Sequence, residues 1–384
     1  MKRFLPLIVS SLIVTLFSYL LTLLLLPDLA SVDTYAPADK GTSWGLSDIY
    51  NSIAHSRKSV KGQADADIVI INIDGCSRPQ IVSLIDAVGE CAPKVVGLDV
   101  LFKYHSDDEL LQSIQFCDNI VLPYGLKFES SSPDGISLEG SFFYDALKDK
   151  DYGFVNLGAD TGLDVVRQFR TYADVRGERI DNFSAAVVRL ADPEKYDQLL
   201  NRGNEFETIY YSSYIGAKYD AAQVIDEEGW VRPEIVDKLS GKIVLIGDMK
   251  DPGDMHLTPV GELFSGIEIH AKTVATILYG RYIGTSPSWI DWLTAFLATM
   301  LLAFAKFLTE TSVRFKDTLG LLIRLIQVTL LFMFIHIGVE RLVNHNEYMD
   351  FPYSLLMTGF SAMAIDIYKG ITEIVSAIVK KIRK

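Results

Sequence analysis

Aspartates that follow apolar runs are the residues of this 384-residue sequence best suited to hold a ligand. Asp74 and Asp99 each end such a run, and Asp248 and Asp254 follow a third. In an open α/β sheet, ligands bind outside the carboxyl ends of the strands. Carboxylates there can bind a divalent cation, because Ca²⁺ and Mg²⁺ prefer oxygen ligands. They can equally accept hydrogen bonds from loop amides or cap helices. This structural role is the leading interpretation, a ligand or metal site comes second, and catalysis is expected least.

Two further polar residues stand at the start of a predicted helix, Ile267–Tyr279. Glu268 complements the positive end of the helix, and His270 can hydrogen-bond the preceding loop. A pH-sensing or metal-binding role for His270 is the alternative. The sequence has no nucleophile elbow, HExxH, CxxC or phosphate-binding glycine loop, so we expect neither an enzyme nor a cofactor.

The elements that must position these residues form an α/β unit with a largely parallel sheet. Near-continuous apolar runs are typical of strands that are buried on both faces. The helices between them show apolar residues at helical spacing, and βαβ alternation implies parallel pairing. The predicted strands are Asp67–Asp74, Lys94–Leu101, Asn119–Tyr124, Thr208–Ser212 and Lys242–Gly247, the other helices Pro79–Glu90, Asp107–Phe116 and Asn182–Ala191, and the loops Ser130–Gly140 and Asp248–Ser265.

Four apolar segments predict transmembrane helices on either side of this unit, one N-terminal and three C-terminal. Each is long enough for a hydrocarbon core of about 30 Å. They are Phe4–Leu26, Ser288–Leu308, Leu319–Arg341 and Pro352–Lys369. The first is too long for a usual signal peptide, so we expect an uncleaved anchor. The predicted domains are 1–27 (signal anchor), 28–287 (extracytoplasmic domain), 288–370 (three-helix membrane region) and 371–384 (basic amphipathic tail).

The charges predict the orientation. Lys2, Arg3, Lys306 and the lysines after Lys369 fall on one side, and positive residues mark the cytoplasm. We therefore expect an inner-membrane protein with both termini cytoplasmic and the large domain outside. The net charge of −13 is concentrated in residues 28–287, which argues against nucleic acid as a ligand. An acidic surface suits cations or a basic partner, but solubility alone also explains it.

Three more sets of residues lead to specific expectations. Cys91 and Cys117 precede neighbouring strands, which predicts a disulfide between them; three reduced thiols, with Cys76, are the alternative.

Charged residues in membrane helices are usually paired. At matched depths we expect pairs of Arg324 with Asp366 and of Asp291 with His336, although Arg324 can also snorkel to the interface.

Three passages resemble the CHASE type-two family, the sensory extracellular domains associated with cyclases and histidine kinases. They are DIVIINID with KVVGLDVLF, YGFVNLGADTGLDVVRQFR, and GKIVLIGDMKDPGDMHLTPVGELFSGIEIHAKTVATILYG. The third is the most specific, because its Asp, Thr-Pro, Gly and Glu-x-His-Ala elements recur in fixed order; it adds Thr258 to the ligand-binding candidates. Gly75-Cys76-Ser77-Arg78 departs from the longer family segment after the first strand.

The resemblance implies an extracytoplasmic sensor without enzymatic activity. Family members often continue into a kinase or cyclase, whereas this sequence ends at Lys384, so we expect a separate output protein. A structural or assembly component of an envelope complex is the alternative. The candidate partners are a small extracytoplasmic ligand or protein, the lipid bilayer, a cytoplasmic signalling protein bound through 371–384, and a second copy of the chain. No nucleic acid is expected.

Overall fold

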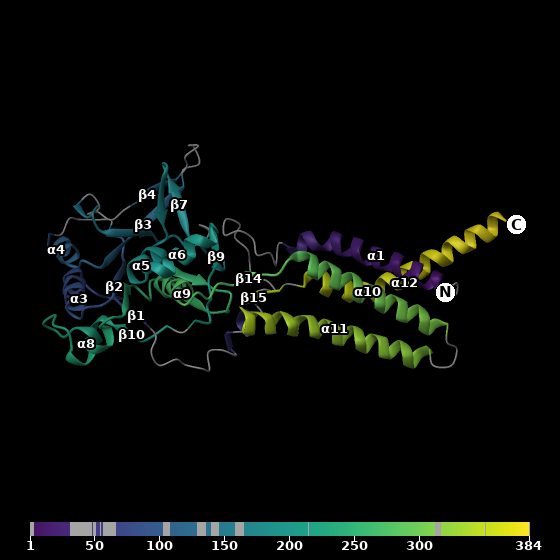
Figure 1. Cartoon of the computed structure of the whole chain (residues 1–384). Coiled ribbons are helices and arrows are strands. Elements are labelled where there is room, and N and C mark those ends of the chain that lie inside the picture. Colours follow the sequence, from purple (N-terminus) through teal and green to yellow (C-terminus); the bar gives the residue numbers. More distant parts are fainter. Residues whose placement is uncertain are drawn as a thin grey trace. The chain divides into compact units, whose positions relative to one another are not determined.

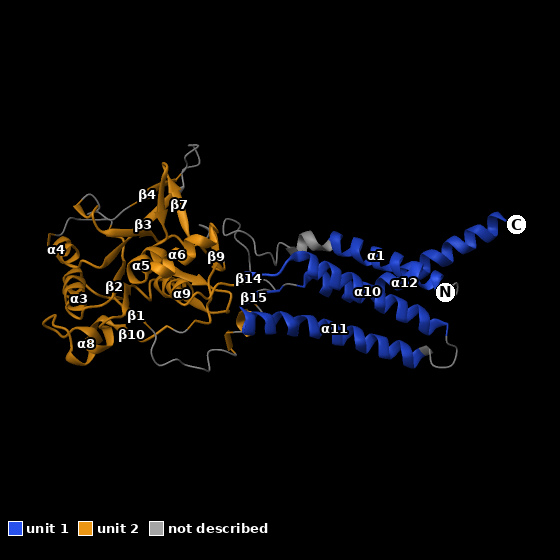
Figure 2. Ribbon diagram, viewed as in Figure 1, with its two compact units in different colours: residues 1–34, 284–384 blue, residues 35–283 orange. Residues whose placement is uncertain are grey.

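The computed structural model describes residues 4–30, 48, 51–53, 55–56, 67–102, 108–128, 136–139, 146–157, 165–213, 215–311, 316–349 and 351–383, with only the backbone for 25–30 and 316. The chain divides into two compact units (Figures 1 and 2). One contains residues 1–34 and 284–384, and the other contains residues 35–283. The passage at residues 158–164 and Asp107 lie outside the described residues, as does most of 31–66.

A seven-stranded sheet forms the centre of the second unit, which confirms the mixed α/β fold with a largely parallel sheet. The strand order is β10-β1-β11-β2-β3-β4, and β5 also pairs with β3. All neighbours are parallel except β3 and β4. The strands are β1 (Ile68–Asn72), β2 (Val95–Asp99), β3 (Ile120–Phe128), β4 (Ile136–Glu139), β5 (Asp151–Phe154), β10 (Lys218–Asp220) and β11 (Ile243–Gly247).

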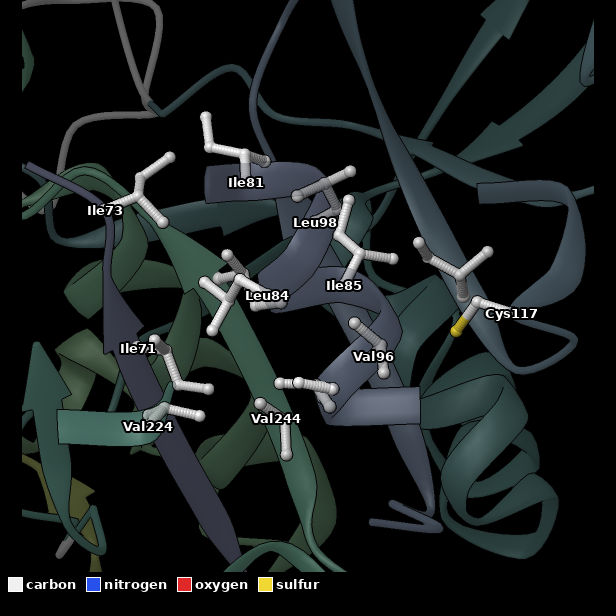
Figure 3. Packing of buried hydrophobic residues seen from close by; sticks show 14 of the residues in the cluster. Ile71, Ile73, Ile81, Leu84, Ile85, Val96, Leu98, Cys117, Val224 and Val244 are labelled. Carbon is white, nitrogen blue, oxygen red and sulfur yellow. The ribbon is translucent and has the colours of Figure 1, made fainter. Parts of the chain in front are cut away.

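Helices cover both faces of this sheet (Figure 1). Strand residues alternate between the two cores: Val69 and Ile71 belong to one, and Ile68 and Ile70 to the other. The first core, part of which is drawn in Figure 3, receives α3 (Arg78–Glu90), α4 (Asp108–Phe116), α7 (Ala221–Val224) and α8 (Pro233–Leu239). The second receives α5 (Phe183–Ala191), α6 (Pro193–Arg202) and α9 (Gly266–Leu278).

Two predicted loops contain short antiparallel strands in the structure. Residues 136–139 of the expected loop Ser130–Gly140 form β4, which pairs with the end of β3. The expected loop Asp248–Ser265 contains a 3₁₀ turn and a hairpin. The remaining elements are η2 (Pro252–Asp254), β12 (Met255–Leu257) and β13 (Leu263–Ser265), with β6 (Gln168–Arg170), β7 (Tyr172–Val175), β8 (Glu178–Asp181), β9 (Phe206–Thr208), β14 (Gly284–Thr285) and β15 (Glu347–Tyr348).

All three cysteines carry free thiols, so the expected Cys91–Cys117 disulfide is absent from the structure. Each buried thiol instead donates to a nearby oxygen. Cys91 Sγ lies 3.2 Å from the Ala87 carbonyl oxygen, and Cys117 Sγ lies 3.6 Å from Asn119 Oδ1. The two thiols belong to the ends of different helices, α3 and α4, and each is satisfied within its own turn of the chain.

In its described residues the first unit contains the strands β14 and β15 and four helices, α1 (Leu5–Ala30), α10 (Ser288–Glu310), α11 (Lys316–His345) and α12 (Pro352–Ile382). Among the described residues, three segments of these helices are long and apolar enough to span a membrane: Leu5–Leu24, Ser288–Glu310 and Asp317–His345, with mean hydropathies of 2.3, 1.6 and 2.1. The chain is therefore a multi-pass membrane protein with one N-terminal and two C-terminal candidate spans.

The expected fourth span, within α12, does not meet this standard. Its apolar residues are diluted by Asp366, Lys369 and small hydroxyl residues. Several of these hydroxyl residues are buried against the other helices: Ser354, Thr358 and Ser361. α12 still packs along α1 and α10, with Ala364 in a cluster that includes Val14 and Ala303. The Tyr368 hydroxyl lies 2.9 Å from Ser10 Oγ, so the middle of α12 lies beside the start of α1 (Figure 1).

Neither expected intramembrane pair forms. Asp291 bonds to the start of α12 instead of His336: its two carboxylate oxygens accept from the Tyr353 and Ser354 amides, each at 2.9 Å. His336 is exposed on the surface of α11. Arg324 and Asp366 are also exposed, and no ion pair joins them in the described part of the chain. The polar links between these helices run elsewhere, from Gln327 to the Thr358 carbonyl and from Lys369 to Glu310.

Candidate functional site

The carboxyl edge of the parallel sheet collects polar residues from four neighbouring strands. The last residues of β10, β1, β11 and β2 are in register: Asp220 pairs with Asn72, Asn72 with Gly247, and Gly247 with Asp99. Each of these four strands therefore ends at the same level. The aspartates that follow them meet at the edge where open α/β sheets bind ligands.

Asn72 connects the loops at this edge. Its side chain is buried, and Nδ2 donates to Asp220 Oδ1 at 2.7 Å. Its Oδ1 accepts from the backbone amides of Asp74 and Met249, at 3.1 and 3.0 Å. One side chain thus fixes the ends of β10, β1 and β11. Asn72 was not among the predicted site residues, because it lies inside an apolar run that is typical of a buried strand; the signal was an amide within that run.

Asp74 and Asp248 both act on the loop after β11. Asp74 Oδ2 lies 3.1 Å from Lys250 Nζ. Asp248 Oδ1 accepts from the amides of Lys250 and Asp251, at 2.8 and 3.2 Å. The bond to Asp74, together with the nearby charges of Asp74, Asp220 and Asp248, raises the pKa of Lys250. These carboxylates therefore create a negative potential that stabilises an ammonium group.

A pocket of about 710 Å³ opens beside these residues. Its walls are the ends of β1 and β10, the start of α3, α7 and the turn at 226–229. Gly229, at φ +88°, lets that turn approach α3, because a Cβ there would meet Ser83 Oγ at 2.8 Å. Of the sequence candidates only Asp74 lines the pocket. The charged lining among the described residues consists of Asp74, Asp220, Asp226, Glu227, Glu228, Arg232 and Lys250.

Asp99 and Asp254 form a separate group towards β2 and α9. Asp254 Oδ2 accepts from the Gly266 amide at 3.0 Å, and Oδ1 lies 3.1 Å from His256 Nε2. Burial, and then the charge of Asp254, raise the pKa of Asp99 to about 7. Within the described residues, the Asp99 carboxylate has neither a hydrogen-bond partner nor an ion-pair partner. It is the least satisfied carboxylate of the predicted set.

His270 lies inside the domain and does not line the pocket. It is 1% exposed, and its Nε2 faces the Val155 carbonyl oxygen at 3.2 Å. Nε2 therefore carries the proton, and Nδ1 accepts from the Ser184 hydroxyl at 3.0 Å. Burial lowers the pKa of His270 to about 4. The imidazole is neutral and both its nitrogens have hydrogen-bond partners, which supports the prediction that His270 hydrogen-bonds within the fold.

Glu268 and Thr258 hold the segment before α9 in place. Glu268 Oε2 accepts from the Ser265 amide at 2.9 Å, which completes a capping box, and its other oxygen binds Lys218 of β10. Although burial opposes it, these bonds lower the pKa of Glu268. Thr258 is buried, and its hydroxyl donates to the Glu262 carbonyl at 2.7 Å across the β12–β13 turn. Both side chains therefore bond to neighbouring parts of the same unit.

No group of three His, Cys, Asp or Glu side chains with a metal-binding arrangement occurs among the residues that the structure describes. The carboxylates instead divide into two groups, one around Lys250 and one around the start of α9. The chemistry available is ion pairing and hydrogen bonding.

Comparison with known proteins gives one family match. A family model described as the CHASE2 domain matches residues 17–307, most of the chain. No curated protein and no solved structure matches the sequence.

Proposed function

The chain belongs to the CHASE2 domain family, and on this basis we propose that it is a membrane-anchored sensor whose large unit binds a ligand outside the cytoplasm. The basic residues near Lys2 and after Lys369 favour this orientation. The family match covers a sensory domain and no catalytic one. A separate protein would then supply the output.

The attachment of α9 to the carboxyl edge of the sheet is the observation that carries the proposal. Asp254 accepts from the Gly266 amide, Glu268 caps the first turn, and Lys218 joins that turn to β10. α9 ends at Leu278, and only residues 279–287 separate it from α10. A ligand that changes the strand ends would change the restraints on α9. Such a signal requires that the ligand binds the two states with different affinity.

The end of α12 supports a cytoplasmic partner. α12 continues without a break to Ile382, beyond the part that packs on α1 and α10. Its last turns expose an apolar stripe of Ile371, Ile374, Val375, Ile378, Val379 and Ile382. Repeated apolar residues on one face suit a partner helix in a groove.

Affinity purification of the full-length protein from its native membranes in mild detergent, followed by mass spectrometry, tests the proposal. We expect to recover a protein with a cytoplasmic signalling domain. Deletion of 371–384 and the double change Ile374→Ser/Ile378→Ser should both abolish recovery. Glu373→Gln/Lys380→Gln, on the side of the same helix opposite the stripe, is the matched control and should retain most of the partner.

An assembly role is the second candidate function, and exposed aromatic residues favour it. Phe116 is 83% exposed and Trp230 is 67% exposed. Large exposed apolar side chains often belong to protein interfaces. Recovery of envelope proteins alone, unaffected by the tail deletion and lost on Phe116→Ser or Trp230→Ser, would replace the sensor proposal with this one.

A further inference from the structure

We propose that the pocket between α3, α7 and the ends of β1 and β10 binds an aliphatic diamine or polyamine through its ammonium groups. This inference rests on the proposed function, because it names the ligand class of the sensor. The volume of about 710 Å³ falls within the range of about 300–1,000 Å³ that is usual for small-molecule sites. The position at the carboxyl edge is also where open α/β sheets bind ligands.

The charges of the lining favour a cation. Five carboxylates line the pocket against two cationic side chains, Arg232 and Lys250. Both cations already have partners, since Lys250 is paired with Asp74 and Arg232 Nε donates to the Ala222 carbonyl at 3.1 Å. In contrast, neither Glu227 nor Glu228 has an ion-pair or hydrogen-bond partner among the described residues. Unpaired negative charge is therefore available to a ligand.

The pocket also has an apolar wall, which favours an organic amine over a bare metal ion as the ligand. Pro79 of α3, Ala221 of α7 and Ile225 contribute it. The removal of methylene groups from water onto such a wall is favourable. A chain of methylenes with ammonium groups at its ends matches carboxylates placed around such a wall.

Lys250 demonstrates that an alkylammonium fits this site. Its Nζ lies 3.1 Å from Asp74 Oδ2, and both residues line the pocket. The lysine side chain is itself a methylene chain that ends in an ammonium group with three donors. The Asp74 carboxylate thus already binds the functional group that we assign to the ligand, and the charge of Asp220 lies near enough to favour it.

Isothermal titration calorimetry of the full-length protein in phosphatidylcholine nanodiscs tests the inference. The probe is 1,4-diaminobutane, and 1,4-butanediol is the uncharged comparator of equal length. We expect binding of the diamine, no binding of the diol, and weaker diamine binding at higher salt. Glu227→Gln/Glu228→Gln should weaken diamine binding at least tenfold; both side chains are exposed and without partners, so the variant should fold.

A charge-matched variant separates local contact from general attraction. Glu194→Gln/Asp197→Asn removes two carboxylates from α6, on the opposite face of the sheet, and should change the affinity less than twofold. No diamine binding, equal binding of the diol, or an equal effect of both variants would overturn the inference. If diamine binding fails but the tail-dependent partner is still recovered, the ligand class is wrong and the sensor proposal stands.

Discussion

Gly266 has no side chain, and this allows the Asp254 carboxylate to reach the first turn of α9. A Cβ at this position would lie 2.4 Å from Asp254 Oδ2, far inside van der Waals contact. The carboxylate accepts from the Gly266 amide itself, so it cannot withdraw without losing that bond. The glycine is therefore required by close approach and not by backbone conformation.

Replacement of Gly266 by alanine should destabilise the protein by about 1–3 kcal/mol, the range for overpacked positions. The measurement is thermal unfolding of the full-length protein in detergent. Gly89→Ala in α3 is the matched control, because nothing lies within 4 Å of the Cβ it would add. Alanine has the higher helix propensity, so that control should be neutral or slightly stabilising. An equal loss in both variants would contradict the role given to Asp254.

Asp99 should make stability depend on pH in the direction opposite to most carboxylates. Its pKa of about 7 in the fold exceeds the unfolded value of about 3.9, so the folded state holds the proton more tightly. Its contribution is full below pH 4 and is lost as the pH rises towards 7. Asp99→Asn replaces the carboxyl by an amide that does not ionise, so the variant does not lose this stability as the pH rises. The variant should therefore gain stability over the wild type between pH 5 and pH 8, by up to a few kcal/mol at ~1.4 kcal/mol per pKa unit.

His270 contributes with the opposite sign and is the internal comparison. Its pKa of about 4 lies below the unfolded value of about 6.5, so its protonation destabilises the fold as the pH falls from 6.5 to 4. Melting temperatures of the wild type and of Asp99→Asn at pH 5 and pH 8 isolate the contribution of Asp99 to the pH dependence of stability, because both proteins contain His270. A difference between the two proteins that does not change with pH would refute the assignment.

At the scale of elements, long apolar runs were predictable and short strands were not. Ile68–Asn72 and Ile243–Gly247 are buried at every position, and that pattern gave both strands and their parallel pairing. β10 has only three residues, and their burial is mixed. It was therefore missed, together with Asp220, which completes the carboxyl edge. The same limitation hid the β12–β13 hairpin that positions Asp254.

Contacts between elements were harder to predict than the elements themselves. Matched depth suggested His336 for Asp291, but depth does not determine which way a helix faces. The structure gives Asp291 a backbone partner in α12, where two amides at the helix start need acceptors. Cys91 and Cys117 show the same limitation, since local acceptors satisfied both thiols.

Asp291→Ala should therefore loosen the start of α12. Two amides would lose their acceptor, which costs about 1–3 kcal/mol for each group left unsatisfied in a buried place. Unfolding in mixed micelles titrated with SDS measures this loss. Asp366→Ala is the control, because Asp366 is exposed in α12. A large effect of Asp366→Ala with none of Asp291→Ala would restore the expected Arg324–Asp366 pair and refute the cap.

At the scale of the whole molecule, the three cysteines provide a test of orientation without added labels. Cys76 is partly exposed, whereas Cys91 and Cys117 are buried. If the large unit lies outside the cytoplasm, a membrane-impermeant maleimide should modify Cys76 in intact spheroplasts. Burial and the charges of Asp74, Asp220 and Asp248 raise the pKa of Cys76. Because the thiolate is the reactive form, labelling should be slow at pH 7 and faster at pH 8.5.

Two variants make this labelling decisive. Cys76→Ser should remove the signal, since the other two thiols are buried. Lys380→Cys, introduced into Cys76→Ser, places the thiol near the end of α12 and should react only after the membrane is opened. The reverse result, with Lys380→Cys labelled in intact spheroplasts and Cys76 protected, would invert the orientation. The large unit would then lie in the cytoplasm. The orientation predicted from the basic residues and the proposal of an extracytoplasmic sensor would both be wrong.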